Sequence, residues 1–230
     1  MTDSMAGRTA LVAGATGLVG SEVVAQLLQD PRVARVIAVG RRPMGIQHER
    51  LLQLTASFDD AEALKRLFLS VPGEIDDAYC CLGTTRKKAG SAEAFIAVDY
   101  TAVVHFADAA RSRGAQRLLL VSSLGADPRS GMLYARTKGE AEAAVQQLGF
   151  SAVAIARPSI LDGERAEDRP GERLGLTVGR ALAALVGRER RFAPIPAASV
   201  ARALIRLAFD IDNGVKVALS DELHRLARAG

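Results

Sequence analysis

The chain has 230 residues, of which 49% are hydrophobic, 24% charged and 4% aromatic, and its formal net charge at pH 7 is +4. This length and hydrophobic content suffice for one domain with a buried core. The few aromatics and short basic clusters argue against a stacking surface for nucleic acid. No apolar run approaches the roughly 18 residues of a membrane span. We therefore expect neither nucleic acid nor a membrane as a partner.

The two cysteines, Cys80 and Cys81, are too few for a disulfide framework, and the start of the chain has no apolar signal segment. We therefore expect reduced thiols and a cytoplasmic location. Adjacent side chains on a strand point to opposite faces, so the pair is better suited to filling the core than to binding one metal. Because His48, His105 and His224 are far apart in sequence, we expect no metal site.

Apolar runs alternate with helical patterns along the first 160 residues. The expected strands lie near residues 9–14, 35–40, 50–57, 76–83, 117–123 and 151–160, and the expected helices near 15–30, 59–70, 91–113 and 132–149. Strands that are continuous apolar runs, most of them followed by a helix, predict a parallel sheet covered on both faces. The fold class is therefore α/β, a doubly wound parallel sheet of the Rossmann type.

The last quarter of the chain has a less regular pattern. It holds helical patterns near residues 174–186 and 199–209, a short apolar run at 216–219 and a closing helix at 220–229. We expect a single domain over residues 1–230. Its core would span 7–158, and a small C-terminal cap on the substrate side would span 159–230.

A glycine-rich turn, G-x-x-G-x-x-G, joins the first strand to the first helix. In such a turn Gly14 permits the tight bend, Gly17 lets backbone approach a pyrophosphate, and Gly20 lets the helix pack close to the strand. Exposed amides and the positive helix end favour anionic oxygens. Because the turn follows a strand and opens a helix, it predicts nucleotide binding.

Two arginines follow the second strand, where many NAD enzymes carry an acid for the ribose 2′-hydroxyl. Arg41 and Arg42 could instead pair with a 2′-phosphate, so the sequence favours NADP(H) as cofactor. Asp59, just after the third strand, could accept a hydrogen bond from the adenine amino group. It could equally be the N-cap of the helix that follows.

A Y-x-x-x-K pair, Tyr134 and Lys138, falls on a predicted helix, where residues four apart share one face. A nearby ammonium stabilises a phenolate, so a tyrosine in this setting can exchange a proton with a carbonyl or alcohol while hydride moves to or from nicotinamide. The same lysine can hold ribose hydroxyls. Ser122 and Ser123 end the preceding strand, at the sheet edge where ligands bind, and a hydroxyl there can orient the substrate oxygen.

With these motifs in place, the chain resembles the short-chain dehydrogenase/reductase superfamily in its atypical or extended branch. The segments "CCLGTTRKKAG", "VSSLGAD", "LYARTKGEAEA" and "EDRPGER" are similar to the Tat-interacting protein (30 kDa, also called CC3) family and its bacterial relatives. The resemblance runs from Arg8 to about Ala208. It implies an NADPH-binding Rossmann domain in which Tyr134 is the proton donor or acceptor, beside Lys138, and Ser123 is the site serine, with Ser122 as the alternative.

The resemblance also implies cofactor contacts at matching positions, with the pyrophosphate on Thr16, Gly17, Leu18 and Val19 and the 2′-phosphate on Arg41 and Arg42. Leu82 and Gly83 would line the adenosine or nicotinamide path. Leu161 and Arg169 would make further contacts with the cofactor. One helix position that often carries an asparagine in the superfamily holds Asp99 here, which leaves a family-style proton relay open.

Two functions fit these features. The first is an NADP(H)-dependent oxidoreductase for a small carbonyl or alcohol substrate, with Tyr134 as acid/base. The second is a regulatory protein that senses NADPH through the same residues and turns over little or nothing. They differ at Tyr134, because its replacement by Phe would abolish turnover in an enzyme but leave the ligand response of a sensor.

Overall fold

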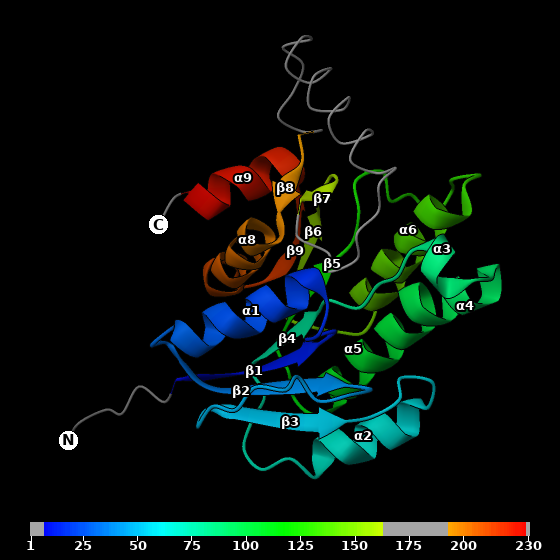
Figure 1. Ribbon diagram of the computed structural model, residues 1–230. Coiled ribbons are helices and arrows are strands. Elements are labelled where there is room, and N and C mark those ends of the chain that lie inside the picture. Colours follow the sequence, from blue (N-terminus) through cyan, green and yellow to red (C-terminus); the bar gives the residue numbers. More distant parts are fainter. Residues whose placement is uncertain (1–6, 163–192, 229–230) are drawn as a thin grey trace.

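The computed structural model describes residues 7–162 and 193–228, which form a seven-stranded sheet with helices on both faces (Figure 1). The strand order is β3-β2-β1-β4-β5-β6-β9, and every pairing in this sheet is parallel. This confirms the doubly wound fold. The strands are β1 (Arg8–Ala13), β2 (Val33–Gly40), β3 (Leu51–Thr55), β4 (Asp77–Cys80), β5 (Arg117–Val121), β6 (Ala152–Arg157) and β9 (Gly214–Leu219).

Two hydrophobic cores hold the helices against the sheet. On one face α1 (Leu18–Gln29) and α8 (Ala197–Asp210) pack together, with α9 (Ser220–Arg228) outside α8. On the other face lie α2 (Ala61–Leu69), α5 (Ala102–Ser112) and α6 (Leu133–Gln146). Phe106 of α5 makes edge-to-face contacts with Phe58 and Phe68, which lie before and within α2, at centroid distances of 6.5 and 6.1 Å. These buried faces explain the apolar spacing in the sequence.

The helical pattern over residues 91–113 is not one continuous α-helix. It divides into α4 (Ala92–Ile96), the π-helical turn η1 (Ala97–Thr101) and α5. Single π-helical turns are rare and often occur at functional positions, because they insert a residue and re-aim side chains. A short helix, α3 (Arg86–Ala89), begins at Thr85, whose hydroxyl accepts from the Lys88 amide. This helix lies between the strand expected at 76–83 and the helix expected at 91–113.

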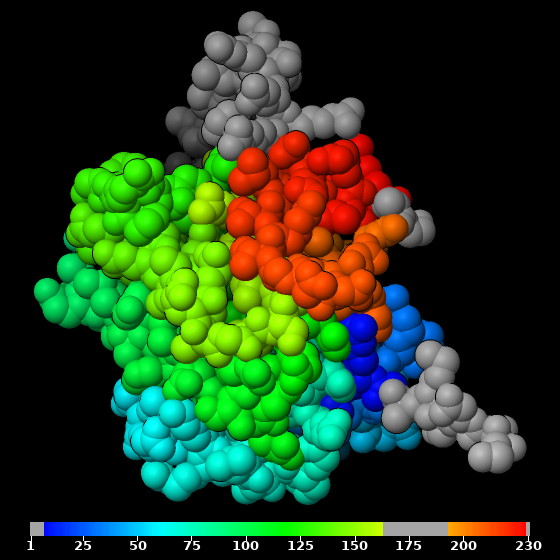
Figure 2. All heavy atoms as spheres, turned by 180° about the vertical axis from the view of Figure 1, so that it is seen from behind, coloured from blue at the N-terminus to red at the C-terminus, as the bar shows by residue number. Residues whose placement is uncertain are grey.

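The C-terminal residues do more than cap the sheet. β9 pairs in parallel with the whole of β6, and α8 packs on α1, so the part of the chain after residue 158 completes the sheet and one helical layer. Seen from behind, the orange-red residues of β9 lie beside the yellow-green residues near β6 (Figure 2). The expected boundary between residues 158 and 159 therefore does not separate the core from a cap.

Two very short strands form a clasp beyond β6. β7 (Leu161–Asp162) pairs in parallel with β8 (Ile195–Pro196), and the Ile195 amide donates to the Ile160 carbonyl at 2.9 Å. The Ser159 hydroxyl donates to the carbonyl of Ala193 at 2.5 Å. The clasp thus joins the two stretches on either side of residues 163–192. The helix expected near 174–186 lies outside the described residues.

No helix within residues 7–162 and 193–228 is both long enough and apolar enough to cross a membrane.

Candidate cofactor and active site

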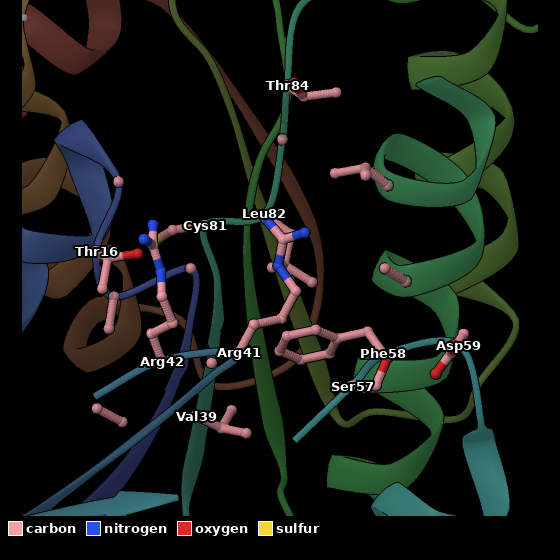
Figure 3. A pocket seen from close by; sticks show the side chains of 18 of the residues that line it. Thr16, Val39, Arg41, Arg42, Ser57, Phe58, Asp59, Cys81, Leu82 and Thr84 are labelled. Atoms are coloured by element: carbon pink, nitrogen blue, oxygen red, sulfur yellow. The ribbon is translucent and has the colours of Figure 1, made fainter. Parts of the chain in front are cut away.

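A cavity of about 650 Å³ lies at the carboxyl ends of the first four strands (Figure 3). In the sheet β1 lies between β2 and β4: the chain first adds β2 and β3 on one side of β1 and then adds β4 on the other side. The strand order therefore reverses at this point. Ligands of open parallel sheets bind at such switch points. The cavity is lined by the glycine turn, the ends of β2, β3 and β4, and η1.

The glycine turn forms one wall, and its Gly14 and Gly20 have no room for a side chain. Gly14 has a φ of +76°, and a Cβ there would lie 2.4 Å from the carbonyl oxygen of Cys81. A Cβ on Gly20 would lie 2.1 Å from the carbonyl oxygen of Gly14. Gly17 is the N-cap of α1 and contributes no side-chain capping bond, which leaves the positive end of the helix available to an anion.

The expected pyrophosphate residues divide into two groups. Thr16 and Gly17 are exposed and line the cavity, whereas Leu18 is half-buried and does not. Val19 and Gly20 are buried inside the first turn of α1. A cofactor could therefore contact Val19 and Gly20 only through their backbone atoms.

Arg41 and Arg42 follow β2 directly, and both side chains extend into the cavity (Figure 3). Arg42 points toward Thr16, and Arg41 points toward Leu82. Neither guanidinium is engaged in a hydrogen bond or ion pair with another described residue, so two cations are available to a ligand at this wall. Gly40, which precedes them, is the last residue of β2.

The opposite wall comes from the segment after β3, which the sequence reasoning largely missed. Ser57, Phe58 and Asp59 all line the cavity. A hydrogen bond from the Ser57 side chain lowers the pKa of Asp59, which favours its carboxylate form. The rule that ligands bind at carboxyl ends of strands would have pointed to this segment.

The reading of Asp59 as a helix N-cap is wrong. Asp60 caps α2, because its side chain accepts from the Ala63 amide at 2.9 Å. Asp59 is exposed and faces the cavity, and its contact with adenine stays a prediction.

The loop after β4 closes the inner end of the cavity through Cys81, Leu82 and Gly83. Cys80 packs in the core under α2 and α5, whereas Cys81 contacts the core under α1, so the two side chains occupy opposite faces as expected. Both thiols are free. Burial raises the pKa of the Cys80 thiol to about 12 and also raises that of Cys81.

Tyr134 and Lys138 both lie on α6, but at different depths. Tyr134 is 39% exposed, and its ring lies 5.6 Å from that of Phe95, tilted by 30°. Lys138 is buried, and its ammonium lies 2.8 Å from Asp99 Oδ1. A Cβ on Gly83 would lie 3.4 Å from the Lys138 nitrogen, which places that ammonium directly behind the cavity wall.

A second cavity, of about 440 Å³, adjoins Tyr134. Ser123 and Tyr134 both line it, so the structure brings together the expected orienting hydroxyl and the expected acid/base. The remaining wall is largely apolar, being formed by Leu124, Pro158, Ser159 and Ile160.

Ser122 is occupied elsewhere. It is buried, and its hydroxyl donates to Glu142 on α6. The same carboxylate pairs with the Arg157 guanidinium at 2.5 and 3.0 Å. Ser123, half-buried and facing the cavity, is therefore the better placed of the two serines.

Two expected cofactor positions remain. Leu161 lies in β7 and lines neither cavity, and Arg169 lies outside the described residues. Among the residues that the structure describes, no group of three or more His, Cys, Asp or Glu side chains is arranged to hold a metal ion.

Sequence comparisons identify a family and individual proteins that are similar to this chain. The sequence model of the family described as NAD(P)H-binding matches residues 14–210. Protein HTATIP2 of Rattus norvegicus is 36% identical over 168 residues, which cover 73% of this chain and 69% of the rat protein. Protein FMP52, mitochondrial, of Candida albicans is 36% identical over 169 residues, which cover 73% of this chain and 74% of the yeast protein.

Solved structures share the fold at lower identity. The UDP-Glc/GlcNAc 4-epimerase of Campylobacter jejuni superposes with a TM-score of 0.69 at 13% identity and covers 95% of this chain and 82% of that one. MoeE5, in complex with UDP-glucose and NAD, superposes with a TM-score of 0.64 at 21% identity and covers 95% and 80%. At these identities the likeness concerns the fold alone.

Proposed function

The chain belongs to the NAD(P)H-binding family and to its HTATIP2-like group of atypical short-chain dehydrogenase/reductases, and from this premise we propose that it is an NADP(H)-dependent oxidoreductase for a small carbonyl or alcohol compound. One observation carries the proposal. A single cavity joins the glycine turn to two unpaired arginines, and the Lys138 ammonium lies directly behind its wall at Gly83.

The residues around the cavity fit a phosphorylated dinucleotide. The amides at the start of α1 would hold the pyrophosphate, because the exposed Gly17 at the N-cap leaves the backbone open to a close approach. Arg41 and Arg42 would pair with the 2′-phosphate, and this supports NADP(H) over NAD(H). When bound, the nicotinamide would supply or accept the hydride.

The chain's own residues would handle the proton and the substrate. Tyr134 would donate a proton to the carbonyl oxygen or accept one from the alcohol, and Ser123, in the same cavity, would hold that oxygen with its hydroxyl. Lys138 would supply a positive charge one helical turn below Tyr134. The apolar wall of the second cavity supports a small, uncharged substrate.

The cofactor part of the proposal is tested by titrating the purified protein with NADPH and NADH and following nicotinamide fluorescence. We expect tighter binding of NADPH. Each of Arg41→Gln and Arg42→Gln should weaken it about tenfold, the value of one charge-assisted hydrogen bond, and leave NADH binding nearly unchanged. Arg66→Gln, which removes an exposed arginine on α2, is the matched control. Equal affinities for the two cofactors would refute the preference.

The catalytic part is tested by NADPH consumption against a panel of carbonyl compounds. The wild-type protein should turn over at least one of them, and Tyr134→Phe should lose turnover but keep NADPH binding. Binding without turnover on every compound would refute the oxidoreductase and support the sensor function instead.

We also propose a cytoplasmic location, supported by the two free thiols. The fungal relatives are named as mitochondrial proteins, so cell fractionation of the native host is the decisive measurement.

A further inference from the structure

The loop that carries Arg41 and Arg42 is held by one glutamine of the neighbouring strand. Gln53 lies in the middle of β3, the edge strand of the sheet, and lines the cavity. Its Oε1 accepts a hydrogen bond from the Met44 amide at 2.6 Å, and its Nε2 donates to the Ile46 carbonyl at 2.7 Å. The two partners fix the orientation of the side-chain amide, because an N–H requires an acceptor and a carbonyl requires a donor.

These two hydrogen bonds lie on either side of a turn. Gly45, between Met44 and Ile46, has a φ of +70°, in the left-handed region that glycine adopts without strain. Within residues 7–162 and 193–228, no other hydrogen bond joins the segment 43–46 to the rest of the protein. Met44 also packs at the margin of the core under α1. Gln53 is therefore the main polar anchor of this loop.

The hold on Met44 reaches the arginines through Pro43. The ring of a proline fixes its own φ near −65°, and it restricts the preceding residue, here Arg42, to extended conformations. The backbone from Arg42 to Met44 thus has little freedom once the Met44 amide is fixed. Arg41 directly follows the last residue of β2, which the sheet holds. The pair is therefore fixed by the sheet on one side and by Gln53 on the other.

The position of this backbone matters because the arginine side chains are not fixed by the protein. Both are exposed, and they diverge: Arg42 points toward Thr16, and Arg41 points toward Leu82 (Figure 3). A long side chain loses conformational freedom when it binds an anion, and a loose loop adds the cost of ordering its backbone. A loop that is already fixed avoids this second cost and binds the anion more tightly.

We propose that Gln53 is a positioning residue for Arg41 and Arg42 and thereby sets the preference for a coenzyme that carries a 2′-phosphate. It fixes the loop from Pro43 to Ile46, so that both guanidinium groups are held where one phosphate can reach them. NADH lacks this phosphate, so the state of the loop should affect its binding little. The preference rests on the proposed function, whereas the hold on the loop is a property of the chain without coenzyme.

The hold on the loop is tested first, without coenzyme, by NMR measurement of hydrogen exchange at the Met44 amide. Gln53→Leu removes both hydrogen bonds, and the amide should exchange about tenfold faster. The matched control is Gln116→Leu, which also removes two side-chain hydrogen bonds, to the Gly114 carbonyl and from the Ser151 hydroxyl, next to the start of β5. It should leave the Met44 rate unchanged. An unchanged rate in Gln53→Leu would overturn the proposal.

The preference is tested by titrating the same variants with NADPH and NADH. Gln53→Leu should weaken NADPH binding about fivefold, the cost of ordering roughly one side chain, and NADH binding by less than about twofold. Gln53→Asn keeps the amide but is one methylene shorter, and it should show the same pattern; Gln116→Leu should match the wild type. Equal losses for both coenzymes, or no loss in either Gln53 variant, would show a structural role only and would overturn the proposal.

A double-mutant cycle tests whether Gln53 acts through the arginines. In a protein carrying Arg41→Gln and Arg42→Gln the loop presents no charge, so adding Gln53→Leu should change NADPH affinity by less than about twofold. A loss of about fivefold in that background would refute the proposal. Equal affinities of the wild type for NADPH and NADH would overturn the proposed coenzyme and this preference together, and faster exchange at Met44 would then support only the hold on the loop.

Discussion

The glycine turn allows a quantitative prediction at Gly20. A Cβ there would lie 2.1 Å from the carbonyl oxygen of Gly14 and 2.7 Å from its carbonyl carbon, both of them backbone atoms. Since real Cβ contacts essentially never fall under 3.0 Å, Gly20→Ala must move α1 away from β1 by about 1 Å. Val23, Val24 and Leu27 of α1 are fully buried and would lose packing.

We expect Gly20→Ala to lower the free energy of unfolding by about 3 kcal/mol, at the upper end of the usual overpacking cost. For a chain of this size that corresponds to a fall in Tm of about 9 °C. NADPH binding should weaken about tenfold if the shift loses one charge-assisted hydrogen bond from the first helical turn.

The assay combines denaturant unfolding with NADPH titration, and the control is Gly131→Ala. Gly131 has ordinary backbone angles, and nothing lies within 4 Å of its added Cβ, so this variant should stay within about 0.5 kcal/mol of wild type. If Gly20→Ala matched the control in both measurements, the close contact between α1 and the glycine turn would not exist as described.

Two further predictions concern groups on β4. Tyr79 is fully buried, and its hydroxyl has no hydrogen-bond partner among the described residues. Tyr79→Phe should therefore raise the free energy of unfolding, measured by denaturant unfolding, by about 1 kcal/mol. A loss of stability would show instead that the hydroxyl is hydrogen-bonded. With a pKa of about 12, the Cys80 thiol has a thiolate fraction of about 10⁻⁴ at pH 8, and burial raises the pKa of Cys81 as well. Alkylation of Cys80 in the native protein should therefore be slow and should become complete only on unfolding, and rapid native labelling of Cys80 would contradict its burial.

Local features of the fold could be predicted from the sequence because they depend on neighbouring residues. The apolar runs located the strands, and the glycine turn located the start of α1. The end of the chain was harder, since nothing in residues 214–219 indicates that they pair with β6 rather than lie apart as a cap. Strand pairing of this kind depends on contacts between distant residues.

The same distinction holds at the candidate site. Tyr134 and Lys138 were found by their spacing on one helix, whereas the partner of Lys138 was not, because Asp99 lies in another segment and reaches it only through helix packing. The choice between Ser122 and Ser123 also required the structure, since it depends on Glu142 and Arg157. The π-helical turn η1 leaves no sequence signature, because the apolar pattern continues through it.

The clasp between β7 and β8 bears on how this family can diversify. It brings the two ends of residues 163–192 to one point, a few residues from Pro158 and Ser159 of the second cavity. Relatives could therefore vary at the clasp itself, at Ile160 or Ile195, and alter the second cavity without altering the glycine turn or Arg41 and Arg42, which line the other cavity.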